Sequence, residues 1–190
     1  FIAEAHKRGL RVITELVINH TSDQHPWFQR ARKAKKGSAA RNFYVWSDTD
    51  DKYQGTRIIF LDTEKSNWTW DPVAKQYFWH RFYSHQPDLN FDNPQVMKAV
   101  LAVMRFWLDK GVDGFRMDVI NLISKDLSFP DDPAVLAGGL DNSLGVAANG
   151  PRVHEFLQEM NREVLSKYPV MTVGETPCVT VDDAALYTGF

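Results

Sequence analysis

The sequence contains a single cysteine, no long apolar run and no large excess of charge. Cys178 cannot form a disulfide within the chain, and with no base beside it we expect a small, buried and unreactive thiol. No stretch is apolar enough to cross a bilayer. The net charge of −2 gives no electrostatic basis for binding nucleic acid or an anionic membrane. We therefore expect a reducing, cytoplasmic location and neither kind of partner.

Signals of metal and phosphate sites are also missing from the sequence. The histidine pairs His20 with His25, and His80 with His85, are spaced so that the two rings cannot share one helix face, and neither pair has an evident third ligand. No glycine-rich phosphate loop follows any predicted strand. We therefore expect the protein to use neither a metal ion nor another cofactor.

The most informative segment is Asp-Gly-Phe-Arg-Met-Asp-Val-Ile, residues 113–120. Residues two apart in a strand share a face, so Arg116 and Asp118 point the same way while Val119 points into packing. A carboxylate in an apolar strand is costly unless it is paired, and Arg116 supplies a cation that favours the ionised form. Asp118 is therefore a candidate nucleophile at the end of a strand.

Strands and helices alternate along the chain, which predicts an α/β fold with a parallel sheet. The predicted buried strands cover residues 11–19, 112–119 and 170–175. Helices are predicted to begin at Asn93-Pro94 and at Pro151. Polar groups follow each strand, which fits both a (β/α)8 barrel and a doubly wound sheet. The missing phosphate loop favours the barrel.

Both ends of the sequence fall within predicted helices. Residues 1–9 resemble the end of a helix with Gly9 at its C-cap. Thr180 to Asp183 form a capping box that opens another helix. We therefore expect a fragment of a larger protein that is inactive and poorly folded in isolation, because three of eight strands cannot close a barrel and leave two open sheet edges.

Two carboxylates on neighbouring parallel strands, Asp118 and Glu175, suit retaining glycoside hydrolysis. One attacks the anomeric carbon, while the other protonates the leaving oxygen and later activates water. The pair alone is weak support, because an ion-paired aspartate and a glutamate at a strand end also occur as structural features.

Four short motifs in this order resemble the signature regions of the α-amylase family of glycoside hydrolases. They are Val17-Ile18-Asn19-His20, Gln86-Pro87-Asp88-Leu89-Asn90, Gly114-Phe115-Arg116-Met117-Asp118 and Val173-Gly174-Glu175. The resemblance implies a (β/α)8 TIM barrel, here partial and covering about strands 3 to 5. It also implies an inserted small domain after the third strand, at residues 21–92, with residues 1–20 and 93–190 belonging to the barrel.

The resemblance also implies roles for individual residues. Asp118 would be the nucleophile, Glu175 the general acid/base and Arg116 the partner of the nucleophile. His20 would hydrogen-bond the sugar at the cleavage point, and Glu15 stands where most members have aspartate. Three further residues would line the glucose pocket or influence linkage preference: Phe82, Gln86 and Val119.

Different parts of the chain resemble two subgroups of that family. Residues 1–112 are similar to the trehalose synthases, and residues from 114 onward are similar to the oligo-1,6-glucosidases. The first hypothesis is a retaining α-glucosidase that cleaves short α-linked glucosides, with an α-1,6 preference implied by Val119. The second is a trehalose synthase that re-attaches glucose within a closed pocket. A third, non-catalytic transporter-associated role is disfavoured because Asp118 and Glu175 are intact.

Overall fold

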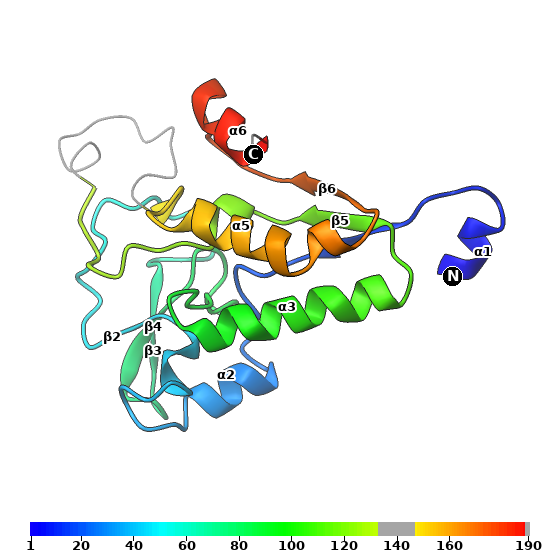
Figure 1. The fold of residues 1–190 in the computed structure, drawn as a ribbon. Helices are drawn as coiled ribbons and strands as arrows, with labels where there is room; N and C mark the ends of the chain where they lie inside the picture. Colours follow the sequence, from blue (N-terminus) through cyan, green and yellow to red (C-terminus); the bar gives the residue numbers. More distant parts are fainter. Residues whose placement is uncertain (133–146, 189–190) are drawn as a thin grey trace.

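A computed structural model describes residues 1–132 and 147–188 and contains a parallel three-stranded sheet (Figure 1). Its strand order is β1-β5-β6, with β5 in the middle. The strands are β1 (Ile13–Leu16), β5 (Gly114–Met117) and β6 (Met171–Gly174). Helix α3 (Pro94–Asp109) precedes β5, and α5 (Val153–Glu163) connects β5 to β6. The predicted parallel βα alternation is confirmed.

A second, antiparallel sheet is formed within the segment between β1 and α3. Its order is β2-β4-β3, from β2 (Trp46–Ser47), β3 (Trp68–Asp71) and β4 (Gln76–Trp79). The other elements are α1 (Ile2–His6), α2 (Pro26–Ala31), η1 (Arg41–Phe43), η2 (Ile120–Leu122), η4 (Leu165–Lys167) and α6 (Val181–Thr188). No helix within residues 1–132 and 147–188 combines the length and apolarity that a membrane span needs.

Local capping signals fix several helix ends where the sequence predicts them. The Asn93 side chain accepts a hydrogen bond from the Gln95 N–H at the start of α3. Thr180 and Asp183 exchange side chain–backbone hydrogen bonds, as expected for a capping box. The predicted start of α5 is two residues early, because the Arg152 N–H donates to Ser124 Oγ and holds Pro151-Arg152 in a turn before the helix.

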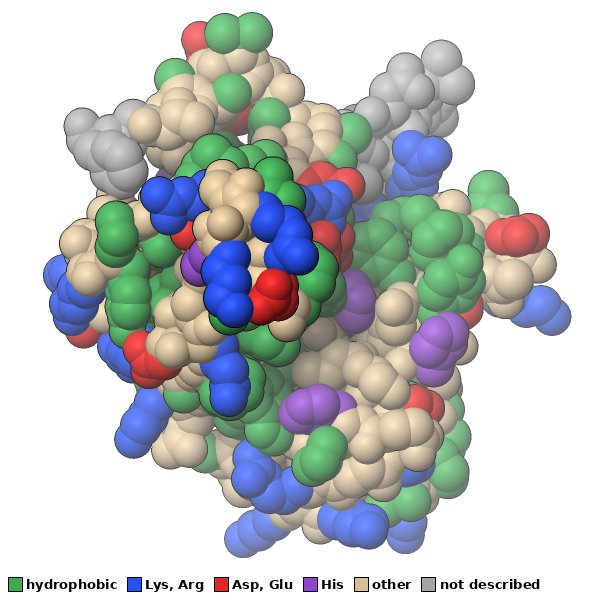
Figure 2. Space-filling view, turned by 90° about the vertical axis from the view of Figure 1, so that its right-hand side faces the viewer, with side chains coloured by type: hydrophobic (Ala, Val, Ile, Leu, Met, Phe, Trp, Pro, Cys, Tyr) green, Lys and Arg blue, Asp and Glu red, His purple; other side chains and the backbone are tan. Residues whose placement is uncertain are grey.

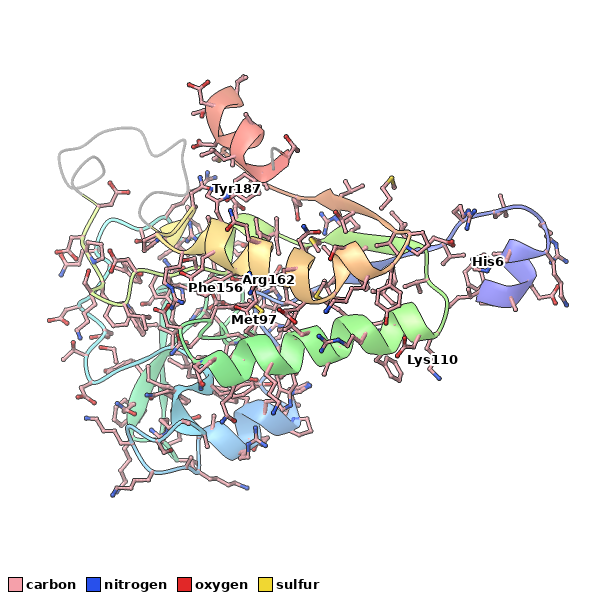
Figure 3. The ribbon with its side chains drawn as sticks, in the orientation of Figure 1. His6, Met97, Lys110, Phe156, Arg162 and Tyr187 are labelled. Atoms are coloured by element: carbon pink, nitrogen blue, oxygen red, sulfur yellow. The ribbon has the colours of Figure 1, made fainter. Side chains whose placement is uncertain are left out.

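One hydrophobic core joins the two sheets. Met97 of α3 and Phe156 of α5 both belong to it and lie between these helices (Figure 3). Phe28, Phe43 and Phe78, from the segment before α3, pack into the same cluster. Residues 21–92 therefore share apolar packing with the parallel sheet.

The outer strands are more exposed than the sequence predicts. Ile13 and Val17 are 40% and 45% exposed, and all four residues of β6 are exposed. Both β1 and β6 lie at an edge of the three-stranded sheet, so their outer sides have no neighbouring strand among the described residues. The prediction of a buried Cys178 is also wrong: it is exposed, in the loop after β6. Figure 2 shows hydrophobic side chains exposed on one face of the molecule, next to groups of charged side chains.

Asp113 anchors α1 to the amino-terminal end of β5. Its carboxylate accepts hydrogen bonds from the Val12 N–H at 2.7 Å, Arg11 at 2.8 Å and His6 Nε2 at 2.7 Å. These three contacts, the backbone one foremost, lower the pKa of Asp113. Helix α1, which stands apart from the rest of the chain in Figures 1 and 3, is thereby tied to the sheet.

Substitution of Gly114 by alanine is expected to destabilise the protein by about 1–3 kcal/mol. A Cβ at Gly114, where φ is +154°, would lie 1.7 Å from the Met171 carbonyl oxygen, so β5 and β6 would have to separate. Gly9→Ala is the matched control, because Gly9 also has positive φ but open space around it. Equal urea midpoints for the two variants would show that any loss of stability comes from backbone strain and not from the close approach of the strands.

Candidate active site

The candidate site lies at the carboxyl ends of the three parallel strands. Asp118 follows β5 and Glu175 follows β6, and backbone pairing continues past both strand ends. The Asp118 N–H donates to the Leu16 carbonyl at 3.2 Å, and the Glu175 N–H donates to the Met117 carbonyl at 2.9 Å. Neighbouring strands lie about 4.8 Å apart, which is close to the separation of about 5–5.5 Å between the carboxyl groups of retaining glycosidases.

Arg116 joins the two candidate catalytic carboxylates. Its Nη1 forms ion pairs with both Asp118 and Glu15, and its Nη2 lies 2.7 Å from Glu175 Oε2. The predicted pairing of Arg116 with Asp118 is therefore present. The sequence did not predict the contact with Glu175, which depends on the register between β5 and β6.

Acidic side chains outnumber basic ones in this cluster. Three carboxylates, those of Glu15, Asp118 and Glu175, surround one guanidinium group. The hydrogen bond from Arg116 to Glu15, and to a smaller extent the one to Asp118, raise the pKa of the arginine. The guanidinium group is therefore charged at any pH at which the protein is folded. A carboxylate held in place beside a bound sugar, as Asp118 is by Arg116, stabilises positive charge that develops on the sugar in an oxocarbenium-like transition state.

Val119 lies just past β5, in a left-handed backbone conformation with φ of +37°. Such a conformation is a genuine outlier for a β-branched residue. It aims the Val119 N–H at Glu175 Oε2, 3.2 Å away. The side chain is buried and packs with Leu122 and Phe82, in agreement with its predicted inward orientation.

The structure brings His20 together with Phe82, and His20 and Gln86 both line one cavity. The rings of His20 and Phe82 lie 5.3 Å apart. Burial lowers the pKa of His20, which favours the neutral ring at neutral pH. A cavity of about 410 Å³ has His20 and Gln86 in its wall, but among the described residues neither Asp118 nor Glu175.

A buried ion pair that the sequence did not predict supports the His20 segment. Lys125 Nζ donates to Asn19 Oδ1 at 2.6 Å and lies 3.0 Å from Asp88 Oδ2. Lys125 and Asp88 are almost completely buried, and burial lowers the pKa of the lysine while Asp88 opposes that shift. The sequence offers only a weak signal, a lysine two residues after the apolar pair Leu122-Ile123, where a buried cation would need a partner.

Metal-binding geometry is not found in the part of the chain that the structure describes. There, no three histidine, cysteine, aspartate or glutamate side chains are grouped closely enough to hold an ion. Two cationic side chains lie at the site: Arg116 beside the carboxylates, and Lys125 beside Asp88 and Asn19.

A parallel β/α sheet with a guanidinium-linked carboxylate pair at its carboxyl edge is the arrangement expected of an α/β glycosidase. Comparison with known proteins makes this specific. The chain belongs to the α-amylase family, since the family model "Alpha amylase, catalytic domain" matches residues 1–189. The family comprises TIM-barrel glycoside hydrolases and related isomerases.

The similar proteins include both subgroups suggested by the motifs. Oligo-1,6-glucosidase of Parageobacillus thermoglucosidasius is 49% identical over 189 residues, which are 98% of this chain and 33% of that protein. Trehalose synthase of Thermus thermophilus is 65% identical over 119 residues, 63% of this chain and 12% of that protein. The chain thus spans about a third or less of the length of these relatives.

A solved structure has the same fold. The crystal structure of Bacillus licheniformis trehalose-6-phosphate hydrolase superposes with a TM-score of 0.84 and 45% identity, covering 98% of this chain and 32% of that one. The predicted resemblance to the α-amylase family, with its oligo-1,6-glucosidase and trehalose synthase subgroups, is confirmed.

Proposed function

We propose that the protein containing this chain is a retaining α-glucosidase that hydrolyses short α-linked glucosides, with a preference for α-1,6 bonds. The observation that carries the proposal is the contact of Arg116 with both Asp118 and Glu175 at adjacent strand ends. Similarity to an oligo-1,6-glucosidase over nearly the whole chain supports the substrate class. The presence of Val119 after the nucleophile supports the linkage.

In the proposed mechanism, Asp118 attacks the anomeric carbon while Glu175 donates its proton to the departing glycosidic oxygen. The C–O bond breaks, and a covalent glucosyl–Asp118 ester forms. Water then gives a proton to Glu175 and attacks the same carbon, which releases glucose and regenerates both carboxyl groups. Arg116 orients Asp118 between these steps, and the neutral ring of His20, with Phe82 and Gln86, contacts the sugar.

The proposed architecture assigns β1, β5 and β6 to the third, fourth and fifth strands of the barrel. Residues 1–20 and 93–190 belong to the barrel, and residues 21–92 form the insert. The antiparallel sheet confined to that segment supports the division. The shared core described above means that the insert is packed onto the barrel wall.

A trehalose synthase is the second candidate, because the identity of 65% to the Thermus thermophilus enzyme is higher than that to the glucosidase. In that reaction the glucosyl–Asp118 ester would be attacked by a retained glucose instead of water. Exclusion of water from the closed pocket would decide between the two outcomes.

Incubation of the full polypeptide with maltose and isomaltose, followed by proton NMR, separates these functions. We expect the glucose from the non-reducing unit of isomaltose to appear first as the α-anomer, because two inversions at its anomeric carbon retain the configuration. Trehalose from maltose would instead establish the isomerase. Glucose appearing first as the β-anomer would contradict the covalent mechanism in either form.

A further inference from the structure

The segments that follow β5 and β6 are joined by three hydrogen bonds. The Val119 N–H donates to Glu175 Oε2 at 3.2 Å, and the Ile120 N–H donates to the Glu175 carbonyl at 3.0 Å. The Asn121 side-chain amide donates to the Pro177 carbonyl at 2.9 Å. Two of these bonds hold the backbone that follows the Glu175 Cα, and the third holds the Glu175 carboxylate.

The Asn121 side chain leaves one of its own polar atoms without a partner in the part of the chain that the structure describes. It is completely buried, and its Oδ1 has no hydrogen-bond partner among the described residues. A buried acceptor without a partner destabilises a fold, so an apolar residue of similar size would be tolerated or preferred for stability alone. The amide donor is what such a residue would lack, and that donor acts on the loop carrying Glu175.

The arrangement also distinguishes the two oxygens of Glu175. Oε2 accepts from the Val119 N–H and contacts Arg116 Nη2 at 2.7 Å. Of the described residues, none donates to Oε1. A proton held for the leaving group would therefore reside on Oε1. The direction in which the O–H bond of Oε1 points depends on how firmly Oε2 and the backbone are held.

We propose that Asn121 is a positioning residue for Glu175: by holding the 175–177 loop against residues 119–121, it directs Glu175 Oε1 toward the glycosidic oxygen. This inference rests on the proposed function, in which Glu175 is the general acid/base. Asn121 acts through Glu175 and touches no substrate atom itself. The backbone carbonyl of Asn121 accepts a hydrogen bond from the Asn149 N–H at 2.8 Å, which holds the Asn121 backbone in place.

The test compares two substrates on the Asn121→Leu variant of the full polypeptide. Isomaltose, or maltose for an isomerase, needs protonation of its leaving oxygen, whereas 4-nitrophenyl α-glucoside has a leaving group that departs without it. We expect kcat/KM for the disaccharide to fall about tenfold to a hundredfold, a part of the usual contribution of a general acid. The value for the aryl glucoside should stay within about threefold, since Asp118 is unaffected.

The ratio of the two kcat/KM values is independent of how much variant is folded, because both substrates report on the same active molecules. Asn121→Ala, which removes the donor without filling the space, should give the same ratio, and the exposed Asn42→Leu should leave it unchanged. Equal losses on both substrates, or no loss on either, would overturn the inference. An unsubstituted protein that cleaves neither substrate would instead refute the proposed function.

Discussion

Replacement of Asp118 by asparagine is expected to lower kcat on the preferred disaccharide by about 10⁴-fold or more. The amide cannot attack the anomeric carbon, and removal of a nucleophile typically costs at least this much. Initial rates on maltose, isomaltose and 4-nitrophenyl α-glucoside would measure the loss, which should be similar for all three. This uniform loss distinguishes Asp118 from Asn121, whose replacement should affect only substrates with poor leaving groups.

The Asp118 variant is expected to remain folded. Arg116 keeps its ion pairs with Glu15 and Glu175, and Asp118 is partly accessible to water. Asp62→Asn, at an exposed position, is the matched control and should retain full activity. An Asp118→Ala variant measured in parallel guards against deamidation of the new asparagine. Near-normal turnover by the alanine variant would contradict the assignment of the nucleophile.

Replacement of Lys125 by methionine is expected to destabilise the protein by about 3–5 kcal/mol. That is the typical cost of removing one partner of a buried ion pair, because the carboxylate of Asp88 stays buried without its cation. The loss would appear as a lower urea midpoint for the full polypeptide. Lys98→Met, on the exposed side of α3, changes the same atoms at the surface and should shift the midpoint little.

A double variant tests the reason for this loss. Adding Asp88→Asn to Lys125→Met removes the unpaired charge, so the double variant should recover part of the stability. Additive losses would show that Lys125 contributes through packing instead of charge pairing. A midpoint for Lys125→Met equal to that of Lys98→Met would contradict the role of the buried pair altogether.

Features encoded by neighbouring residues could be predicted from the sequence. The α3 cap at Asn93 and the placement of Asp118 and Glu175 after successive strands depend on short patterns. Contacts between distant segments could not be predicted. The Arg116–Glu175 pair requires the register of β5 on β6, and the Lys125 pair requires three segments to meet in the interior.

The prediction that the outer strands are buried was wrong for a different reason. β-branching and apolarity indicate that β1 is a strand, but burial depends on what covers it. Ile13 is exposed because β1 pairs on one side only among the described residues. Side-chain identity thus predicted the type of element better than its environment.

The pairing of Ile13 with Gly114 also has a consequence for synthesis on the ribosome. Partners across this pair of strands, such as Glu15 and Arg116, are 101 residues apart. At a translation rate of about 5–20 residues per second, β1 emerges roughly 5–20 s before the strand that will pair with it. Residues 21–92 emerge one after another during that interval, and their aromatic side chains can pack against β1 before β5 leaves the exit tunnel.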